Sequence, residues 1–215
     1  MPAPISSPSN PAGDAPRASV ALIRVACGDP EYLFLKRAEN PKDPWSGHYA
    51  LPGGRRESGD RDLLDTCIRE TLEECGLSLN PAHLLQSLPP AMAGKPSGSA
   101  TVVAPFLFEI PERPVLSLDP EEIAAFHWLP LSYLLDAGNH ARACLSRHYP
   151  HLSFPCLRVG PAGEGEAIWG FTYGVLQRSL PGFPQAGISE TEATPIKGGR
   201  ESGLPGPESA EAGRE

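Results

Sequence analysis

The pattern of apolar and polar positions divides the chain into a foldable middle and two ends that lack a core-forming pattern. Large apolar side chains recur between residues 18 and 180. Residues 1–17 and 181–215 are dominated by Pro, Gly, Ser, Ala and Glu, with only isolated large apolar residues. Such stretches bury too little apolar surface to offset the entropy lost on ordering. We therefore expect one domain over residues 18–180, flanked by disordered segments at 1–17 and 181–215.

Short apolar runs bounded by turn residues predict β-strands on both sides of one long helix. The runs VALIRVA at Val20–Ala26 and YLFLK at Tyr32–Lys36 flank a turn signal of Gly, Asp and Pro. Further strands are expected at Tyr49–Leu51, Leu84–Leu88, Thr101–Ile110 and Glu122–Trp128. Pro105 has no backbone N–H to donate, so its strand is expected at a sheet edge or a bulge.

Helical spacing of apolar residues predicts the long helix at about 62–75. Asp60 or Asp62 can cap its start, and Gly76 can end it in the left-handed conformation. Its apolar stripe comprises Leu63, Leu64, Cys67, Ile68, Leu72 and Cys75. A short helix is expected at Leu131–Asp136, a terminal helix at Ile168–Leu180, and loops at Glu39–Gly47 and Ala91–Ser99. This order of elements is typical of an α/β protein with a mixed sheet between helices.

Composition and charge narrow the function classes. The formal net charge is −8, and no basic cluster is present, which argues against a general nucleic-acid binder. No apolar run approaches the roughly 18 residues that a membrane span requires, and the N-terminus lacks the pattern of a secretory signal. The five cysteines include no Cys-x-x-Cys pair, which is typical of a reducing compartment. We therefore expect a cytoplasmic protein with no membrane partner, and leave a homodimer open.

Candidate chemistry lies on the polar side of the long helix. Glu70, Glu73 and Glu74 follow the i, i+3, i+4 spacing, which places side chains about 5–6 Å apart on a helix surface. Carboxylates at so short a distance repel one another, by about 1 kcal/mol in water and more at lower dielectric. A hard divalent cation would relieve that repulsion, and oxygen ligands are what Mg²⁺ prefers. The alternative is an ordinary amphipathic helix with a solvated acidic face.

The residues around this cluster resemble the box of the Nudix hydrolases. Gly54 and Asp60 bracket five residues, and eight more precede the run Arg69-Glu70-Thr71-Leu72-Glu73-Glu74-Cys75-Gly76. Asp in place of the usual Glu, together with the longer spacer, resembles the coenzyme A pyrophosphatase subgroup of that family. So do the stretch from Arg37-Ala38 to Leu51-Pro52-Gly53-Gly54 and the segment Ile168-Trp169-Gly170.

The resemblance implies a Nudix α/β/α sandwich with a mixed sheet and a metal-dependent pyrophosphohydrolase. It implies Mg²⁺ or Mn²⁺ bound by Glu70, Glu73 and Glu74, with Glu73 and Glu74 the firmest ligands. The implied substrate is a small-molecule nucleotide, namely coenzyme A or acyl-CoA, cleaved to adenosine 3′,5′-bisphosphate and (acyl-)4′-phosphopantetheine. Alternatives are ADP-ribose or another nucleoside diphosphate derivative, and a ligand-binding regulator of the same fold without turnover.

The resemblance also assigns roles to neighbouring residues. Arg69 is expected to form an orienting salt bridge to Asp60 or Glu57. The general base is left open between Glu70 and an acid outside the box, Glu121 or Glu122. Substrate-binding candidates are Arg37, Gly53, Gly54 and Arg55.

Asp43 stands where the subgroup pattern has an Arg. An acid facing the site would repel a phosphate-rich ligand. Asp43→Arg is therefore expected to improve turnover of coenzyme A or to leave it unchanged.

Overall fold

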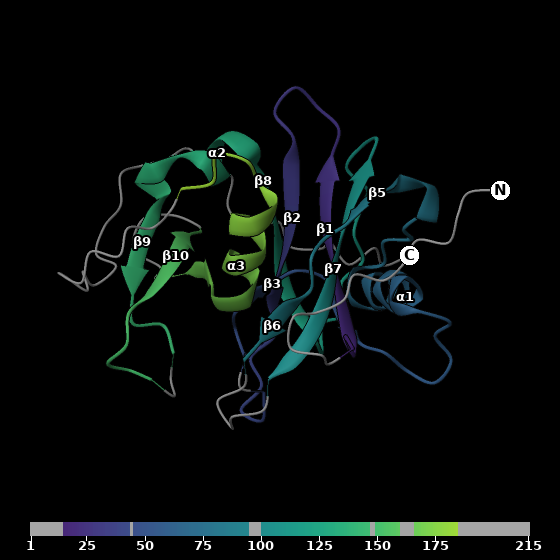
Figure 1. The fold of residues 1–215 in the computed structure, drawn as a ribbon, viewed down its shortest axis with the longest axis horizontal. Coiled ribbons are helices and arrows are strands. Elements are labelled where there is room, and N and C mark those ends of the chain that lie inside the picture. The colour runs from purple at the N-terminus through teal and green to yellow at the C-terminus, as the bar shows by residue number, and fades with distance from the viewer. Residues whose placement is uncertain (1–14, 44, 95–99, 147–148, 160–165, 185–215) are drawn as a thin grey trace, which may run out of the picture.

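The computed structural model describes residues 15–43, 45–94, 100–146, 149–159 and 166–184, and every structural statement concerns these residues. The segments expected to be disordered lie outside them, apart from residues 15–17 and 181–184. Figure 1 shows a central twisted sheet with helices on both sides.

Eight strands form the central mixed sheet. Parallel pairing joins β1 to β7, and the other neighbours are antiparallel. From one edge to the other the sheet runs through β8, β2, β1 and β7, with β5 and β6 both on the far side of β7. The strands are β1 (Ala18–Val25), β2 (Glu31–Arg37), β3 (Tyr49–Ala50), β4 (Gly53–Arg55), β5 (Leu84–Ser87), β6 (Ala91–Ala93), β7 (Thr101–Ile110) and β8 (Ile123–Pro130).

The sheet opens between β1 and β2, and this opening positions the site. The two strands pair directly only near their hairpin, where Arg24 lies opposite Tyr32. Farther from the hairpin, β3 pairs with the end of β2 and β4 pairs with the start of β1. The connection from β3 to β4 therefore crosses the opening, and the glycines of β4 lie at the face that the long helix covers.

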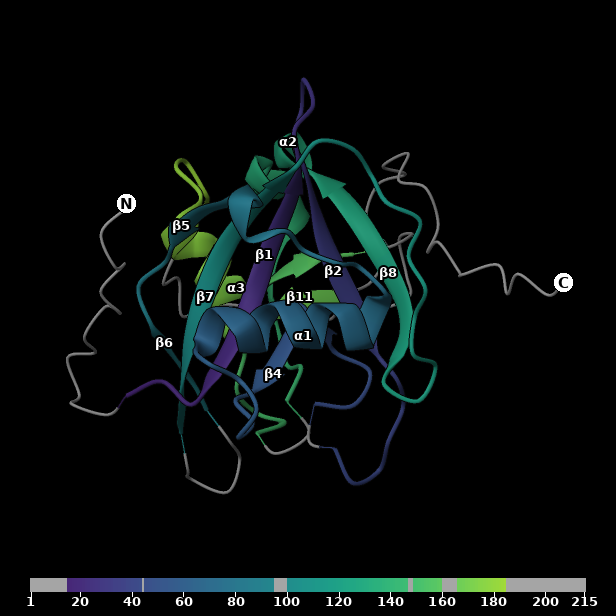
Figure 2. The same cartoon turned by 90° about the vertical axis from the view of Figure 1, so that its right-hand side faces the viewer.

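Two layers cover the sheet. Helix α1 (Leu63–Cys75) crosses one face, with β1 and β4 beneath it (Figure 2). The opposite face carries α2 (Leu131–Leu135), α3 (Gly170–Ser179) and a second antiparallel sheet (Figure 1). That sheet contains β9 (His140–Ala143), β10 (Phe154–Arg158) and β11 (Ala167–Trp169), and two 3₁₀ turns lie at Pro81–His83 and Ala137–Asn139.

Alternation along β1 supplies a core to each layer. Ile23 and Val25 pack in the cluster that contains the buried residues of α1, whereas Leu22 packs in the cluster that contains those of α3. This is the expected consequence of side chains that point to opposite faces at successive strand positions. The α/β/α sandwich with a mixed sheet is confirmed.

The expectation that Pro105 marks a sheet edge is wrong. Strand β7 is central, with β1 on one side and β5 and β6 on the other. The carbonyl of Pro105 accepts from Leu88 N at 2.9 Å. The N and O atoms of one residue point to the same side of a strand, so the missing N–H faces the gap where β5 has ended and β6 has not begun. An interrupted neighbour thus accommodates a proline within the sheet.

Other boundaries also differ from expectation. The terminal helix starts at Gly170 rather than at Ile168. Residues 168–169 belong instead to strand β11. Strand β6 occupies the start of the expected loop Ala91–Ser99. Strands β9 and β10 were not predicted. Phe183, beyond the expected domain boundary, is buried and contacts the rings of His140 and Tyr173.

Candidate active site

Helix α1 begins and ends where its sequence dictates. The Asp62 carboxylate accepts from the backbone N–H groups of Leu64 and Asp65, both at 2.9 Å, which satisfies two donors that the first turn leaves without helical partners. Gly76 ends the helix at φ +69°, a conformation that favours glycine, and its N–H donates to Leu72 O. Of the two capping alternatives, Asp62 is the cap, which leaves Asp60 available for another role.

The buried face of α1 differs from the expected apolar stripe. Leu72 is 49% exposed. The fully buried positions are Thr66, Cys67, Thr71 and Cys75, whose small side chains allow the helix to lie close to the sheet. Glu74 is also buried, with its side chain only 6% exposed, whereas the Glu73 side chain is 57% exposed. The acidic cluster therefore runs from solvent into the interface between helix and sheet rather than pointing uniformly outward.

Arg69 joins the box loop to the helix. Its Nε donates to Asp60 Oδ1 at 3.0 Å and its Nη2 to Asp60 Oδ2 at 3.1 Å. It also pairs with Glu70 and Glu73. Asp60 in turn accepts from Glu57 N and Thr66 Oγ1, and these contacts lower the pKa of its carboxyl well below the usual range, with the Arg69 hydrogen bonds the largest cause. Of the two expected partners, Asp60 holds Arg69.

The glycines of β4 accommodate the two inner carboxylates. Gly53 N donates to Glu74 Oε2 at 2.9 Å, and Gly53 has a φ of +144° with no space for a Cβ against Ser19 and Val20. A Cβ on Gly54 would lie 2.4–2.5 Å from the carboxylate of Glu70. Gly54 is therefore required by the position of Glu70, and Gly53 by its own backbone conformation and its close approach to β1, contacts that motif spacing alone does not reveal.

Burial and mutual repulsion raise the pKa values of both inner carboxyls. For Glu74 burial is the main cause and raises the pKa to about 8, with Glu70 and Glu122 adding to it; the Gly53 N–H and Arg37 act in the opposite direction. For Glu70 burial again comes first, and Arg69 opposes it. Glu122 also raises the pKa of Glu70, so its negative charge acts on the same site.

A turn after the helix brings Glu122 to this site. Asp119 N donates to Glu74 O at 3.0 Å, and Ser117 N donates to Cys75 O at 3.0 Å, so this turn satisfies carbonyls that the end of α1 leaves without helical partners. The N–H groups of Glu122 and Ile123 donate to Asp119 O. Between the two acids considered outside the box, this arrangement favours Glu122 over Glu121.

The donor chemistry fits a hard divalent cation. Glu70 and Glu74 are inner carboxylates that repel each other, and Glu122 adds to that repulsion. Oxygen ligands of this type suit Mg²⁺ or Mn²⁺. Over the described residues, no three His, Cys, Asp or Glu side chains already form a group that could hold a metal ion. Glu73, paired with Arg69 at 2.7 Å, would have to turn away from that partner to join the set.

The expected substrate-binding residues separate into two groups. Arg37 lies at the inner carboxylates, with Nη1 4.0 Å from Glu74 Oε1. Arg55 is exposed, and its backbone carbonyl accepts from Arg69 Nη2. The neighbouring Arg56 donates to the carbonyls of Asp60 and Arg61 and so holds the box loop.

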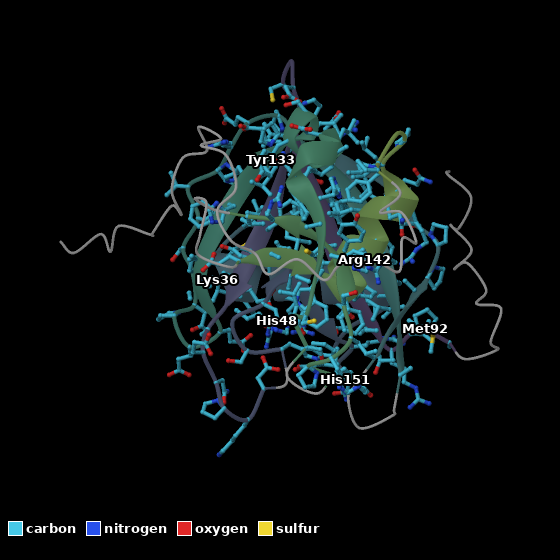
Figure 3. The ribbon with its side chains drawn as sticks, turned by 90° about the vertical axis from the view of Figure 1, so that its left-hand side faces the viewer. Lys36, His48, Met92, Tyr133, Arg142 and His151 are labelled. Carbon is cyan, nitrogen blue, oxygen red and sulfur yellow. The ribbon has the colours of Figure 1, made fainter. Side chains whose placement is uncertain are left out.

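Sequence reasoning missed a polar and aromatic group on the opposite side of the sheet. There Glu166 pairs with Lys36 and accepts from the Tyr49 hydroxyl. The rings of His48 and Trp169 meet edge to face, with centroids 5.0 Å apart. Figure 3 views this side, with Lys36 and His48 labelled. The signal available in the sequence was alternation, since Lys36 must face away from Arg37 along β2.

All five cysteines are free thiols. Cys67, Cys75 and Cys156 are buried, and burial raises the pKa of Cys75 to about 12 and that of Cys156 to about 11. Thiols of this kind are small core residues rather than nucleophiles.

Comparison with known proteins identifies the family. The NUDIX domain family matches residues 15–149, which include the entire box. The chain belongs to the Nudix family. This Nudix hydrolase is 30% identical over 170 residues to the human protein named mitochondrial coenzyme A diphosphatase NUDT8, covering 76% of this chain and 68% of that protein.

The chain is also similar to further proteins and shares its fold with a solved structure. The mouse NUDT8 protein is 29% identical over 192 residues, or 86% of each chain. An uncharacterised protein of Schizosaccharomyces pombe (strain 972 / ATCC 24843) is 36% identical over 110 residues, but the match covers only 33% of its length. The crystal structure of a MutT/nudix family protein from Enterococcus faecalis has the same fold, with a TM-score of 0.52 at 18% identity over 77% of this chain and 61% of that one.

The family membership supports a pyrophosphohydrolase, and Nudix hydrolases generally use divalent metals. No helix within the described ranges is long and apolar enough to cross a membrane.

Proposed function

We propose that this Nudix hydrolase cleaves the diphosphate of coenzyme A or an acyl-CoA. Its products would be adenosine 3′,5′-bisphosphate and 4′-phosphopantetheine or its acyl form. The observation that carries the proposal is the similarity to mouse mitochondrial coenzyme A diphosphatase NUDT8 along 86% of both chains. The Asp60 box with its eight-residue spacer supports the same subgroup.

We assign the cation to Glu70, Glu73 and Glu74, with Mg²⁺ or Mn²⁺ as the candidates. Bound there, the cation would neutralise diphosphate oxygens and acidify a bound water. The chain's own groups hold the ligands in place: Gly53 N–H orients Glu74, Gly54 leaves room for Glu70, and Asp60 fixes Arg69. Arg69 has an orienting role rather than a phosphate-binding one in this arrangement.

Glu122 is our candidate for the general base, the carboxylate that takes the proton from the attacking water, with Glu70 as the alternative. The charge of Glu122 acts on both Glu70 and Glu74, and its backbone is anchored beside the end of α1. Glu70 is paired with Arg69 and is assigned to the cation, which leaves it less available to take up a proton.

The substrate is tested by comparing kcat/KM for coenzyme A, acetyl-CoA, ADP-ribose, a dinucleoside polyphosphate and dNTPs at millimolar Mg²⁺. We expect coenzyme A or the acyl-CoA to be the best substrate, with cleavage at the diphosphate. A preference for ADP-ribose would reject the coenzyme A assignment and leave the family assignment intact.

Glu73→Gln and Glu74→Gln are each expected to reduce turnover by several orders of magnitude while keeping the fold. Near-wild-type turnover in either variant would remove that residue from the ligand set.

The compartment and the assembly also stay proposals. The buried free thiols suit a reducing environment, and we keep the cytoplasm as the predicted location. The mouse and human relatives are named mitochondrial, which makes that organelle the alternative. Cell fractionation separates the two, and light scattering tests the homodimer.

A further inference from the structure

The Asp43 side chain joins the loop after β2 to the strand itself. Its Oδ2 accepts from Arg37 Nε at 2.8 Å, and its Oδ1 accepts from Trp45 N at 3.0 Å. The side chain is only 15% exposed. Both carboxylate oxygens are therefore committed, one to a cation on β2 and one to the loop backbone.

The loop after β2 has other hydrogen bonds that do not involve the Asp43 carboxylate. Ser46 Oγ donates to Glu39 Oε2 at 2.8 Å and accepts from Asn40 N at 2.8 Å. Gly47 adopts φ +71°, and a Cβ there would lie 2.4 Å from Glu39 Oε1. The loop is thus anchored independently, and the contact with Arg37 is the distinct contribution of Asp43.

Arg37 connects Asp43 with the active-site carboxylates. Alternation along β2 places Arg37 on the same face as Leu33 and Leu35, which pack in the cluster that contains buried residues of α1. Asp43 takes the Nε hydrogen, while Nη1 lies 4.0 Å from Glu74 Oε1. A guanidinium has five N–H donors in a fixed plane, so an anchor at Nε sets the direction of the remaining four.

We propose that Asp43 is a positioning residue, which holds the Arg37 guanidinium beside Glu74 so that its free N–H donors face the diphosphate of the substrate. The proposal rests on the proposed function only in placing a diphosphate at these carboxylates. It reverses the expectation drawn from the sequence, because Asp43 does not confront the substrate as a bare negative charge. An Arg at position 43 would repel Arg37 and leave the guanidinium without its anchor.

The proposal is tested with a double-mutant cycle of Asp43→Asn and Arg37→Ala. The amide oxygen of Asn can accept from only one of the two present donors, and its NH₂ group is itself a donor. We expect Asp43→Asn to raise KM on the order of tenfold with a smaller effect on kcat, the size of one lost charge-assisted hydrogen bond. Asp43→Asn should add nothing in the Arg37→Ala background. Additive losses would overturn the proposal.

Ser46→Ala is the matched control, because it removes loop hydrogen bonds without touching Arg37. We expect it to lower the melting temperature while leaving KM unchanged. If Ser46→Ala raised KM as much as Asp43→Asn does, Asp43 would act only through loop structure, and the proposal would be rejected. Asp43→Arg should lose activity, and a gain would equally reject it.

A binding measurement separates this proposal from the identity of the substrate. The probe is the non-hydrolysable α,β-methylene analogue of ADP, titrated calorimetrically in the presence of Mg²⁺. Its Kd should rise by a similar factor in Asp43→Asn and Arg37→Ala and stay unchanged in Ser46→Ala. An unchanged Kd in Asp43→Asn would contradict the proposal, whichever nucleotide the enzyme prefers to cleave.

Discussion

At the scale of single residues, three neighbouring glutamates occupy three different environments. Glu73 is mostly exposed and paired with Arg69, whereas Glu70 is partly buried and lies against Gly54. Glu74 is buried and accepts from Gly53 N–H. The sequence spacing predicts that the three lie on neighbouring positions, but it contains no information on depth. Depth depends on how the helix is rotated on the sheet, and the fully buried Thr71 and Cys75 mark the side of the helix that faces the core.

The raised pKa of Glu74 predicts how the metal-free protein responds to pH. The pKa is about 8 in the folded state, against 4.5 for the ordinary carboxyl. The folded state therefore binds the proton more tightly than the unfolded state does. The resulting contribution of Glu74 to the free energy of unfolding is fully present below about pH 4.5 and is lost as pH rises through 8. In the presence of EDTA, the melting temperature of wild type should fall relative to Glu74→Gln between pH 5.5 and 8.5. A gap between the two melting temperatures that stays constant over this range would contradict the assignment.

At the scale of elements, β4 and α1 fit together because Gly54 of β4 leaves room for the Glu70 carboxylate of the helix. Most elements could be predicted from local patterns. Strands β1, β2 and β7 have strong apolar runs, and α1 has an amphipathic pattern with a clear cap at each end. The strands β9 and β10 could not, since their short segments are stabilised by pairing with each other and with β11. The role of Gly54 was likewise hidden, because it depends on the Glu70 carboxylate that the fold brings above it.

Gly54→Ala should therefore disrupt the site without unfolding the protein. Its Cβ would lie 2.4–2.5 Å from the Glu70 carboxylate, which must move. We expect turnover to fall at least tenfold, with a loss of stability of about 1–3 kcal/mol from overpacking. Gly59→Ala is the control, because a Cβ there meets nothing within 4 Å. Its kcat/KM should stay within twofold of wild type, and equal losses in the two variants would show that the box loop tolerates no Cβ for another reason.

At the scale of the whole molecule, the two faces of the sheet perform separate tasks. The carboxylates and Arg37 lie on the face covered by α1. The opposite face of the sheet is covered by α3 and the second sheet (Figures 1 and 2). The apolar pattern predicted this layering. It did not predict where the folded part ends, because a lone Phe183 in a Gly- and Pro-rich segment resembles the residues after it until the partners His140 and Tyr173 are known.

Phe183→Ala tests this division between stability and activity. The ring is 4% exposed, and its centroid lies 4.9 Å from that of His140 and 5.1 Å from that of Tyr173. Its removal should cost about 3 kcal/mol, which corresponds to a melting temperature lower by roughly 6–12 °C for a domain of this size. Activity per folded molecule should be unchanged at 20 °C, because α3 lies on the other side of the sheet from Glu74. Val115→Ala is the control. Val115 is 97% exposed, so its substitution should leave the melting temperature within about 2 °C of wild type.

Truncation tests the same contact of Phe183. A chain ending at residue 184 keeps Phe183 and should melt at a higher temperature than a chain ending at residue 180. If the two truncated chains melted together, Phe183 would not contribute to the core.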